Sequence, residues 1–300
     1  MDYKKIFKNK KMRFKILSAL RFVPDKLMLK IQYRIKFGRK LDLKNPKRYT
    51  EKIQWYKLNY RNPNMQVCAD KCKVREYVKS KGLEHILNDL YAVFKTPEEI
   101  SFDYLPNEFI LKLSNGSSTN VVIEDKSVAD IKTIKAKFID FKKQSGASAG
   151  REWCYKSSDA PVIVAERLLR DRNNENGSLR DYKILCFNGE PAYIICVDGR
   201  YTDHYCHVVY DTDWNKQNVI IGESSAAANY ERPEKLDEML EYARVLSEEF
   251  PVARIDLYCI DGNIYFGEIT FFPWSGYMYF KPDGFDYELG KYFLLPEKNN

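Results

Sequence analysis

The sequence lacks the features that mark a membrane-spanning or a secreted protein. No apolar run approaches the roughly 20 residues that cross a bilayer, and the lysine-rich start has neither the apolar core nor the cleavage site of a signal peptide. The seven cysteines are an odd number without paired CxxC motifs, which is typical of reduced thiols rather than of a disulfide scaffold. We therefore expect a cytoplasmic protein.

Common ligand-binding signatures are scarce as well. Two of the three histidines, His204 and His207, flank Cys206, but ligands this crowded lack the spacing of a zinc finger. The P-loop pattern GxxxxGK[ST] is absent, as are internal repeats and low-complexity linkers. With 300 residues, 44% of them hydrophobic and 30% charged, the chain has room for a large core, and we expect one compact α+β body.

Acidic residues are nearly absent from the first 40 positions. Residues 1–40 contain 14 Lys and Arg but only Asp2 and Asp25, a net charge of +12, whereas the rest of the chain carries −5. Apolar residues are interleaved with the basic ones, so a helix on an anionic membrane surface and a solvated basic cap both remain open. Nucleic acid is not an expected partner, because the aromatic residues show no RNA-binding spacing.

Periodicity and end signals divide the chain into helices and strands. The pattern predicts helices over residues 50–60, 70–81, 126–144 and 233–250, whereas residues 24–38 fit a helix or a strand equally well. Apolar alternation and short apolar runs predict strands over residues 109–113, 121–123, 162–165, 182–187, 192–197 and 207–210, with a type I′ turn at Asn188-Gly189.

The most informative stretch is ARIDLYCIDGNIYFGEITFFPWSG, which begins at Ala253 and reads as a β-hairpin. A three-residue loop over positions 261–263 would place Asp256 opposite Glu268, whereas an unbulged two-residue turn would send Glu268 to the other face. Opposed bare carboxylates repel, and a divalent cation would reverse that repulsion. With Arg254 beside them, these acids indicate metal-assisted phosphate chemistry. An ordinary solvent-facing hairpin is the alternative.

Three further segments carry groups that suit a nucleotide. Lys112 ends a strand just before a small polar loop, in which backbone N–H groups can approach phosphate oxygens; a plain hairpin turn is the alternative. The loop residues are Ser114, Asn115, Gly116, Ser117 and Ser118. A second strand ends at Glu166 and passes into a linker at Arg167 and Leu168 that can meet an adenine edge. Asp181 and Lys183 share a face of the next strand and suit ribose and phosphate. An acid at a strand end and a surface ion pair are the alternatives.

The order of these parts resembles the ATP-grasp superfamily, which clamps ATP between two α+β subdomains. The motifs narrow this resemblance to the TupA-like family, named for teichuronopeptide biosynthesis, over about residues 50–295. They are ADKCKVREYV from Ala69, the Lys112 loop, REWCYK from Arg151, DYKILCFNGEP from Asp181, the Asp213-Trp214 pair and GEITFFPWSG from Gly267. The implied plan is a basic helical N-terminal extension over residues 1–48, a preceding region over 49–108 and an ATP-grasp domain over 109–296.

The resemblance implies a role for each candidate residue. ATP would be bound by Lys112 and its loop, by Glu166, Arg167 and Leu168 at adenine, by Asp181 at ribose and by Lys183 at phosphate. Mg²⁺ would be held by Asp256 and Glu268, with Thr270 where many ATP-grasp ligases have Asn. Arg254, together with Lys183, would stabilise the transferring phosphoryl group.

The activity implied by the resemblance is that of an ATP-dependent carboxylate-amine ligase in bacterial cell-surface polysaccharide synthesis. An acyl-phosphate intermediate would link a carboxylate sugar or glycan intermediate to an amino acid or amine. Candidates for the acceptor site are Arg151, Trp153, Arg200 and Trp274. A basic N-terminal segment would place the enzyme at the inner face of the plasma membrane. A sugar kinase with the same ATP site, or a catalytically weak membrane-associated scaffold, is the alternative.

Overall fold

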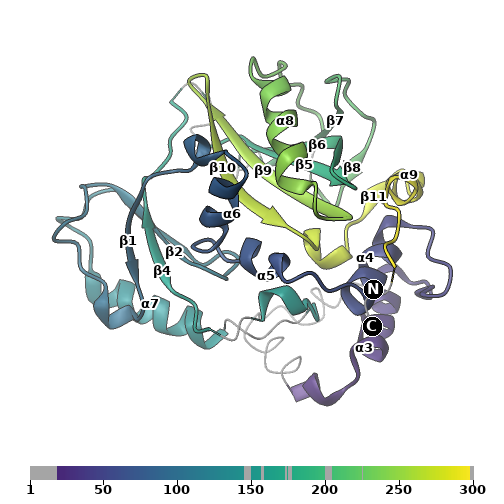
Figure 1. Ribbon diagram of the computed structural model, residues 1–300, viewed down its shortest axis with the longest axis horizontal. Coiled ribbons are helices and arrows are strands. Elements are labelled where there is room, and N and C mark those ends of the chain that lie inside the picture. Colours follow the sequence, from purple (N-terminus) through teal and green to yellow (C-terminus); the bar gives the residue numbers. More distant parts are fainter. Residues whose placement is uncertain are drawn as a thin grey trace.

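The computed structural model describes residues 19–144, 150–156, 159–172, 174, 178–199, 205–224 and 226–297. They form a four-stranded and a five-stranded antiparallel sheet with helices packed on both, which confirms the predicted α+β class (Figure 1). Within these residues no helix is long and apolar enough to cross a membrane.

The four-stranded sheet forms the smaller part of the molecule. Its order is β1-β4-β2-β3, with β1 (Leu90–Phe94), β2 (Phe109–Leu113), β3 (Asn120–Ile123) and β4 (Ile163–Glu166). The buried residues of β2 pack with Ile134 and Phe138 of α7 (Ile131–Gln144), which lies along this sheet (Figure 1). Strand β1 was not predicted, because the periodicity of a five-residue apolar run such as LYAVF does not distinguish a strand from a buried helix segment. It adds an edge strand to this sheet from within the predicted preceding region.

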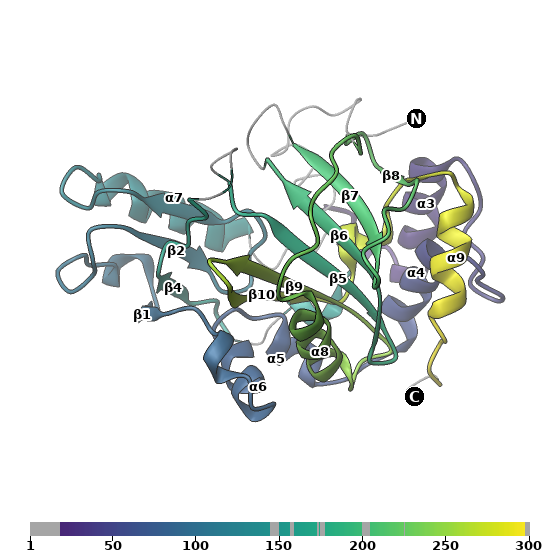
Figure 2. The same cartoon turned by 90° about the horizontal axis from the view of Figure 1, so that it is seen from above.

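The five-stranded sheet carries the larger core. Its order is β10-β9-β5-β6-β7, with β5 (Asp181–Phe187), β6 (Glu190–Asp198), β7 (Cys206–Asp211), β9 (Val252–Ile260) and β10 (Asn263–Thr270). Helix α8 (Leu236–Ser247) packs on β5, β6 and β9, and α4 (Tyr49–Asn59) and α9 (Gly284–Tyr292) lie at one end of the sheet (Figure 2). At that end the ring of Phe187 contacts Tyr49 and Tyr292.

The remaining elements connect and cover the sheets. Two of them, β8 (Ile220–Ile221) and β11 (Phe280–Lys281), form a two-stranded ladder. The others are α3 (Asp25–Phe37), α5 (Asn64–Cys68), α6 (Val74–Ser80) and the 3₁₀ turns η1 (Leu20–Phe22), η2 (Glu84–Ile86), η3 (Pro97–Glu99), η4 (Trp153–Tyr155) and η5 (Pro273–Gly276).

Residues 24–38, which fitted either a helix or a strand, form helix α3. Met28, Leu29 and Tyr33 are buried on one side of it, and the Tyr33 hydroxyl lies 2.9 Å from the Thr50 hydroxyl of α4. Residues 1–18 of the predicted basic extension lie outside the described part of the chain.

The structure shortens three predicted helices and adds α9. The helices expected over residues 126–144 and 233–250 are α7 and α8, with the narrower bounds given above. The helix expected over residues 70–81 begins only at Val74, because Asp70 Oδ1 accepts the backbone N–H of Cys72 and Lys73 at 2.9 and 3.1 Å and holds a turn there. Helix α9 was not predicted, since Gly284 and Gly290 lower its helical propensity.

The closing hairpin reaches the expected pairing by a different route. Its turn has two residues, Asp261 and Gly262, with φ of 49° and 71°, so the predicted three-residue loop is wrong. A bulge between Phe266 and Glu268 shifts the register by one residue and places Glu268 opposite Asp256. Gly267 permits the bulge, because a Cβ there would lie 2.9 Å from the Asp256 carbonyl oxygen.

Candidate functional site

Six polar side chains meet on one face of three neighbouring strands in the large sheet. Lys183 of β5 lies opposite Asp256 of β9, which lies opposite Glu268 of β10. The other three lie at two-residue spacing along the same strands and therefore point the same way. The structure thus brings together the predicted Asp181, Lys183, Arg254, Asp256, Glu268 and Thr270.

Asp256 is the centre of this group. Its side chain is 2% exposed, and its two oxygens accept from Arg254 Nε at 2.6 Å and Nη2 at 2.7 Å, the fork geometry of a strong arginine-carboxylate pair. Lys183 also donates to Asp256 and lies 2.6 Å from Asp181 Oδ2. Two buried cations therefore balance two buried carboxylates before any ligand is considered.

Burial and pairing act on these charges in opposite directions. Burial opposes the charge on Arg254, but Asp256 and Glu268 outweigh it and raise the pKa of the guanidinium, which stays charged. Burial raises the pKa of Asp256 above its ordinary value, although Arg254 and Lys183 oppose the shift. Removing either cation would leave the carboxylate without its compensation.

Glu268 is the open acid of the group. Its side chain is 44% exposed, and Oε1 accepts from Arg254 Nη2 at 3.2 Å. The same Nη2 donates to the Thr270 hydroxyl at 3.0 Å. Within the described ranges no cluster of three or more His, Cys, Asp or Glu side chains is suited to a metal. The pair Asp256 and Glu268 instead fits Mg²⁺ as it binds with one or two carboxylates and substrate phosphates.

The predicted residues of the small sheet form a second charged group. Lys112 Nζ of β2 donates to Glu166 Oε2 of β4 at 2.7 Å, and Arg75 lies 3.8 Å from the other oxygen of the same carboxylate. Glu166 is buried, whereas the Lys112 side chain is 24% exposed. The acid at the end of β4 therefore fixes the direction of the lysine.

The polar loop after β2 divides into an anchored and an open part. Ser114 is fully buried, and its hydroxyl donates to Asp70 Oδ2 at 2.6 Å, so its predicted phosphate contact stays a prediction. Asn115 Oδ1 is buried without a hydrogen-bond partner among the described residues. Ser117 and Ser118 are exposed at the tip, and Ser118 adopts φ of 57°.

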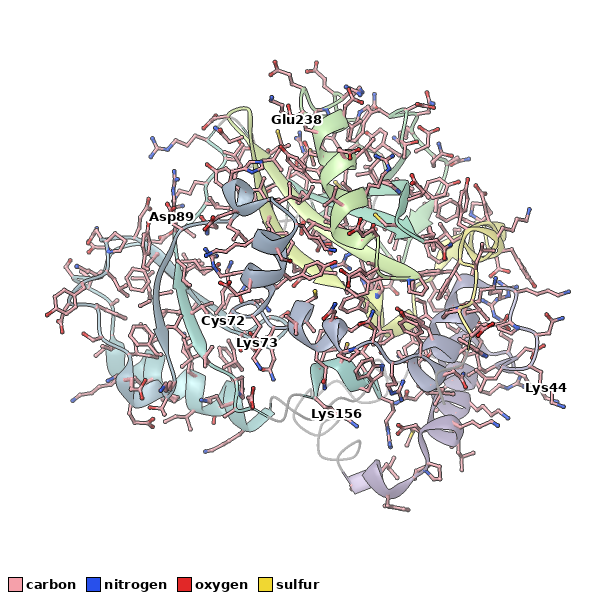
Figure 3. All side chains as sticks on the ribbon, viewed as in Figure 1. Lys44, Cys72, Lys73, Asp89, Lys156 and Glu238 are labelled. Atoms are coloured by element: carbon pink, nitrogen blue, oxygen red, sulfur yellow. The ribbon has the colours of Figure 1, made fainter. Side chains whose placement is uncertain are left out.

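Lys71 is a site residue that sequence reasoning missed. Its Nζ donates to the Gly116 carbonyl at 2.7 Å, and its N–H to the Ser114 carbonyl at 2.8 Å. Burial lowers the pKa of Lys71, with smaller effects from Glu268 and Lys112, one on each sheet. The next two residues, Cys72 and Lys73, lie between the sheets in Figure 3. The sequence motif that contains Lys71, ADKCKVREYV, contributed to the family resemblance. Its lysine follows an aspartate, however, and such a pair is typical of an ordinary surface ion pair.

The predicted adenine linker is partly occupied by the chain itself. The N–H of Arg167 donates to the Asp89 carbonyl at 3.0 Å, and Asn88 Nδ2 donates to the Arg167 carbonyl at 2.8 Å. These bonds tie the linker to the segment before β1. Of the predicted linker residues, Leu168 is therefore better suited than Arg167 to meet an adenine edge through its backbone.

A strained turn follows the acids of β10. Trp274, Ser275 and Gly276 have φ of 48°, 56° and 66°, and the left-handed region costs a non-glycine residue roughly 1–2 kcal/mol. The indole of Trp274 lies over Arg254, 5.3 Å from its guanidinium carbon, and 5.7 Å from the ring of His207. The turn therefore adds an aromatic wall to the charged group.

Other candidates for an acceptor site lie elsewhere. Arg151 binds the N-terminal segment, donating to Asp25 at 2.7 Å and to the Leu20 carbonyl at 2.7 Å. The ring of Trp153 is covered by Arg61 at 4.9 Å. Arg200 lies outside the described residues.

Comparison with known proteins identifies the family. The family model described as "TupA-like ATPgrasp" matches residues 51–294. A search of curated proteins gave no match.

Two solved structures are similar to this chain at low sequence identity. The L-amino acid ligase of Bacillus licheniformis is 16% identical, with a TM-score of 0.45, covering 86% of this chain and 57% of its own. The D-alanine–D-alanine ligase of Bacillus anthracis, solved with ATP, is 16% identical, with a TM-score of 0.39 and coverages of 68% and 53%. This chain thus spans little more than half the length of either protein.

Proposed function

The chain belongs to the TupA-like ATP-grasp family, and from this premise we propose that it is an ATP-dependent carboxylate-amine ligase. Its substrates are a carboxyl-bearing sugar or glycan intermediate and an amino acid or amine, in bacterial cell-surface polysaccharide synthesis. The observation that carries the proposal is the buried Lys183, Asp256 and Arg254 group beside the open carboxylate of Glu268. A group of this kind suits phosphoryl transfer, in which catalysis is mostly positioning and charge neutralisation.

ATP lies between the two charged groups in this proposal. The adenine meets the backbone of Leu168 beside Glu166, and Asp181 binds the ribose. Lys112 and Lys71 approach the phosphates from the small sheet with the N–H groups of residues 115–118, and Lys183 approaches them from the large sheet. Lys71 supports this arrangement, because its ammonium donates to the Gly116 carbonyl in the loop that follows β2, at 2.7 Å.

Mg²⁺ would be held by Glu268 and Asp256, with the Thr270 hydroxyl as a third oxygen. When bound, it would neutralise phosphate charge. Asp256 Oδ2 accepts from both Arg254 Nη2 and Lys183 Nζ, which uses its two lone pairs. Asp256 Oδ1 accepts from Arg254 Nε and has a second lone pair to offer a cation. Glu268, whose side chain is 44% exposed, offers the more accessible carboxylate.

The proposed reaction has two steps, phosphoryl transfer and amide formation. A carboxylate oxygen of the sugar attacks the γ-phosphorus of ATP, forming the acyl phosphate and releasing ADP. The amine nitrogen then attacks the acyl carbon, the bond to the phosphate oxygen breaks, and the amide forms with release of inorganic phosphate and a proton. Arg254 stabilises charge on the phosphoryl oxygens during the first step, and no side chain of the protein becomes covalently attached.

ADP release tests the proposal. Purified full-length protein is incubated with ATP, Mg²⁺, hexuronates and amino acids. The rate of ADP release is measured, and the products are identified by mass spectrometry. The change D256N should lower the rate by about 10²-fold or more. The control D261N makes the same change at the hairpin turn and should retain the rate. An undiminished rate in D256N would overturn the site assignment, and a phosphorylated sugar without amide would favour the kinase.

The described start of the chain supports a membrane contact, which completes the proposal. Helix α3 exposes an apolar stripe in which Leu27 is 51%, Ile31 44% and Ile35 42% exposed. A basic stripe, also exposed, runs beside it. Each of its residues directly precedes one of the apolar residues: Lys26, Lys30 and Arg34. Adjacent apolar and basic stripes at four-residue spacing suit an anionic lipid surface. We infer that α3 holds the enzyme at the inner face of the plasma membrane.

A further inference from the structure

Two buried polar side chains of α4 hold the strained turn after β10. Lys57 Nζ donates to the Ser275 carbonyl at 2.8 Å, to the Ser275 hydroxyl at 2.9 Å and to the Gly150 carbonyl at 2.9 Å. Gln54 Nε2 donates to the carbonyls of Ser275 and Gly276 at 3.1 Å each. Lys57 is 1% exposed and Gln54 is fully buried. These hydrogen bonds stabilise the turn, so the backbone of Trp274 keeps its strained left-handed conformation.

The hydrogen bonds from Lys57 and Gln54 fix where the indole of Trp274 can lie. A Cβ on Gly276 would come within 2.5 Å of Gln54 and of Ile53, so the turn is pressed against α4 and has little room to move. Arg254, over which the indole lies, is only 6% exposed, whereas Trp274 is 39% exposed. The turn therefore covers the guanidinium with an aromatic ring that keeps part of its own surface open.

Polar groups border this open ring. His207 of β7 meets the indole edge-on, and the Tyr205 hydroxyl lies 2.7 Å from His207 Nε2. Neither residue belongs to the predicted ATP or metal sets. An exposed aromatic ring rimmed by a few hydrogen-bonding groups is the composition of a site for a ligand with one apolar face and polar edges.

We propose that Trp274 is the platform on which the pyranose ring of the carboxyl-bearing substrate stacks. The C–H face of the sugar packs on the exposed part of the indole. The hydroxyl of the exposed Tyr205, held in place by the buried His207, binds a sugar hydroxyl, and the carboxylate reaches past the edge of the indole toward Arg254. Lys57 and Gln54 are positioning residues that keep the platform over the reacting group. The inference rests on the proposed ligase function, and it names the part of the site that selects a sugar over a small aliphatic carboxylate.

Binding and turnover of hexuronates test the platform separately. Calorimetric titration of the full-length protein with D-glucuronate and D-galacturonate should show W274A binding about tenfold more weakly, with W274F losing less. In the ADP-release assay W274A should raise the KM for the hexuronate and leave the KM for ATP unchanged. Y104A removes a fully exposed tyrosine beyond the site and serves as the control.

Each outcome separates the platform from the ligase activity. Hexuronate-dependent ADP release with an unchanged KM in W274A would overturn the platform and leave the ligase standing. Binding of a hexuronate that depends on Trp274, without amide product from any amine, would support the platform and count against the ligase. The variant K57M should shift the hexuronate KM in the same direction as W274A, because it releases the turn, and an unchanged KM would overturn the positioning role.

Discussion

The buried ammonium of Lys57 makes stability depend on pH in a predictable direction. Burial lowers the pKa of Lys57 from 10.5 to about 8. Between these values the unfolded chain binds more protons than the folded chain, so the free energy of unfolding rises with pH. A tenfold difference in proton affinity between the two states corresponds to about 1.4 kcal/mol, so the total rise is about 3 kcal/mol.

The variant K57M isolates this effect, because methionine does not titrate and the other groups are common to both proteins. We expect the difference in unfolding free energy, wild type minus K57M, to increase by about 3 kcal/mol from about pH 7.5 to about pH 10.5. Urea denaturation followed by tryptophan fluorescence at several pH values gives this difference. The variant K44M, at an exposed lysine, shows whether loss of any lysine produces the same slope.

A difference that stays flat across this range would refute the reasoning, because it would mean that the ammonium is not penalised by burial. A difference that falls with pH would refute it more strongly. It would show that the three oxygens around Lys57 Nζ stabilise the charged form by more than burial disfavours it.

Two further predictions concern the turn and the membrane. G276A should lower the free energy of unfolding by about 2–4 kcal/mol, because alanine disfavours φ of 66° and its Cβ would overlap Gln54. The control G284A, with open space around the added Cβ, should lower it by about 1 kcal/mol or less. Equal losses in urea denaturation would contradict this prediction. Substituting serine for the three exposed apolar residues of α3 should weaken sedimentation with anionic vesicles. Replacing its exposed basic stripe with glutamine should weaken vesicle binding by about 1 kcal/mol per charge at low salt and reduce its dependence on salt. Unchanged binding in both variants would refute the membrane contact.

Much of the large-sheet site could be predicted because its chemistry follows a two-residue period. Arg254 and Asp256 alternate with apolar residues along β9, and Asp181 and Lys183 are spaced by two along β5. Such a pattern is visible without knowing any partner strand. The resemblance to a family then ordered these strands. The pairing of β5 with β9, which joins the two sets of residues, was not predicted and comes from the structure.

The parts that escaped prediction depend on distant partners. Lys71 belongs to the site only because the loop around Gly116, 45 residues later, receives its side chain. The burial of Ser114 likewise depends on Asp70. The left-handed turn at Trp274 carries no Asn or Asp to signal it, since its conformation is imposed by α4, more than 200 residues earlier.

The bulge at Gly267 separates the closing hairpin into two blocks of register. Between the turn and Phe266 the pairing is set by the two-residue turn, and from Glu268 onward it is set one residue later. Glu268 meets Asp256 because Gly267 is an extra residue in β10: without the bulge, the two-residue turn would pair Gly267 with Asp256 and Glu268 with Ile255, on the other face. Straightening the ladder while keeping Gly267 would therefore turn the Glu268 carboxylate away from Asp256, whereas deleting Gly267 outright would leave the glutamate directly after Phe266 and still opposite Asp256. A natural sequence with no residue between this phenylalanine and this glutamate would carry the same site with one residue fewer between its two acids.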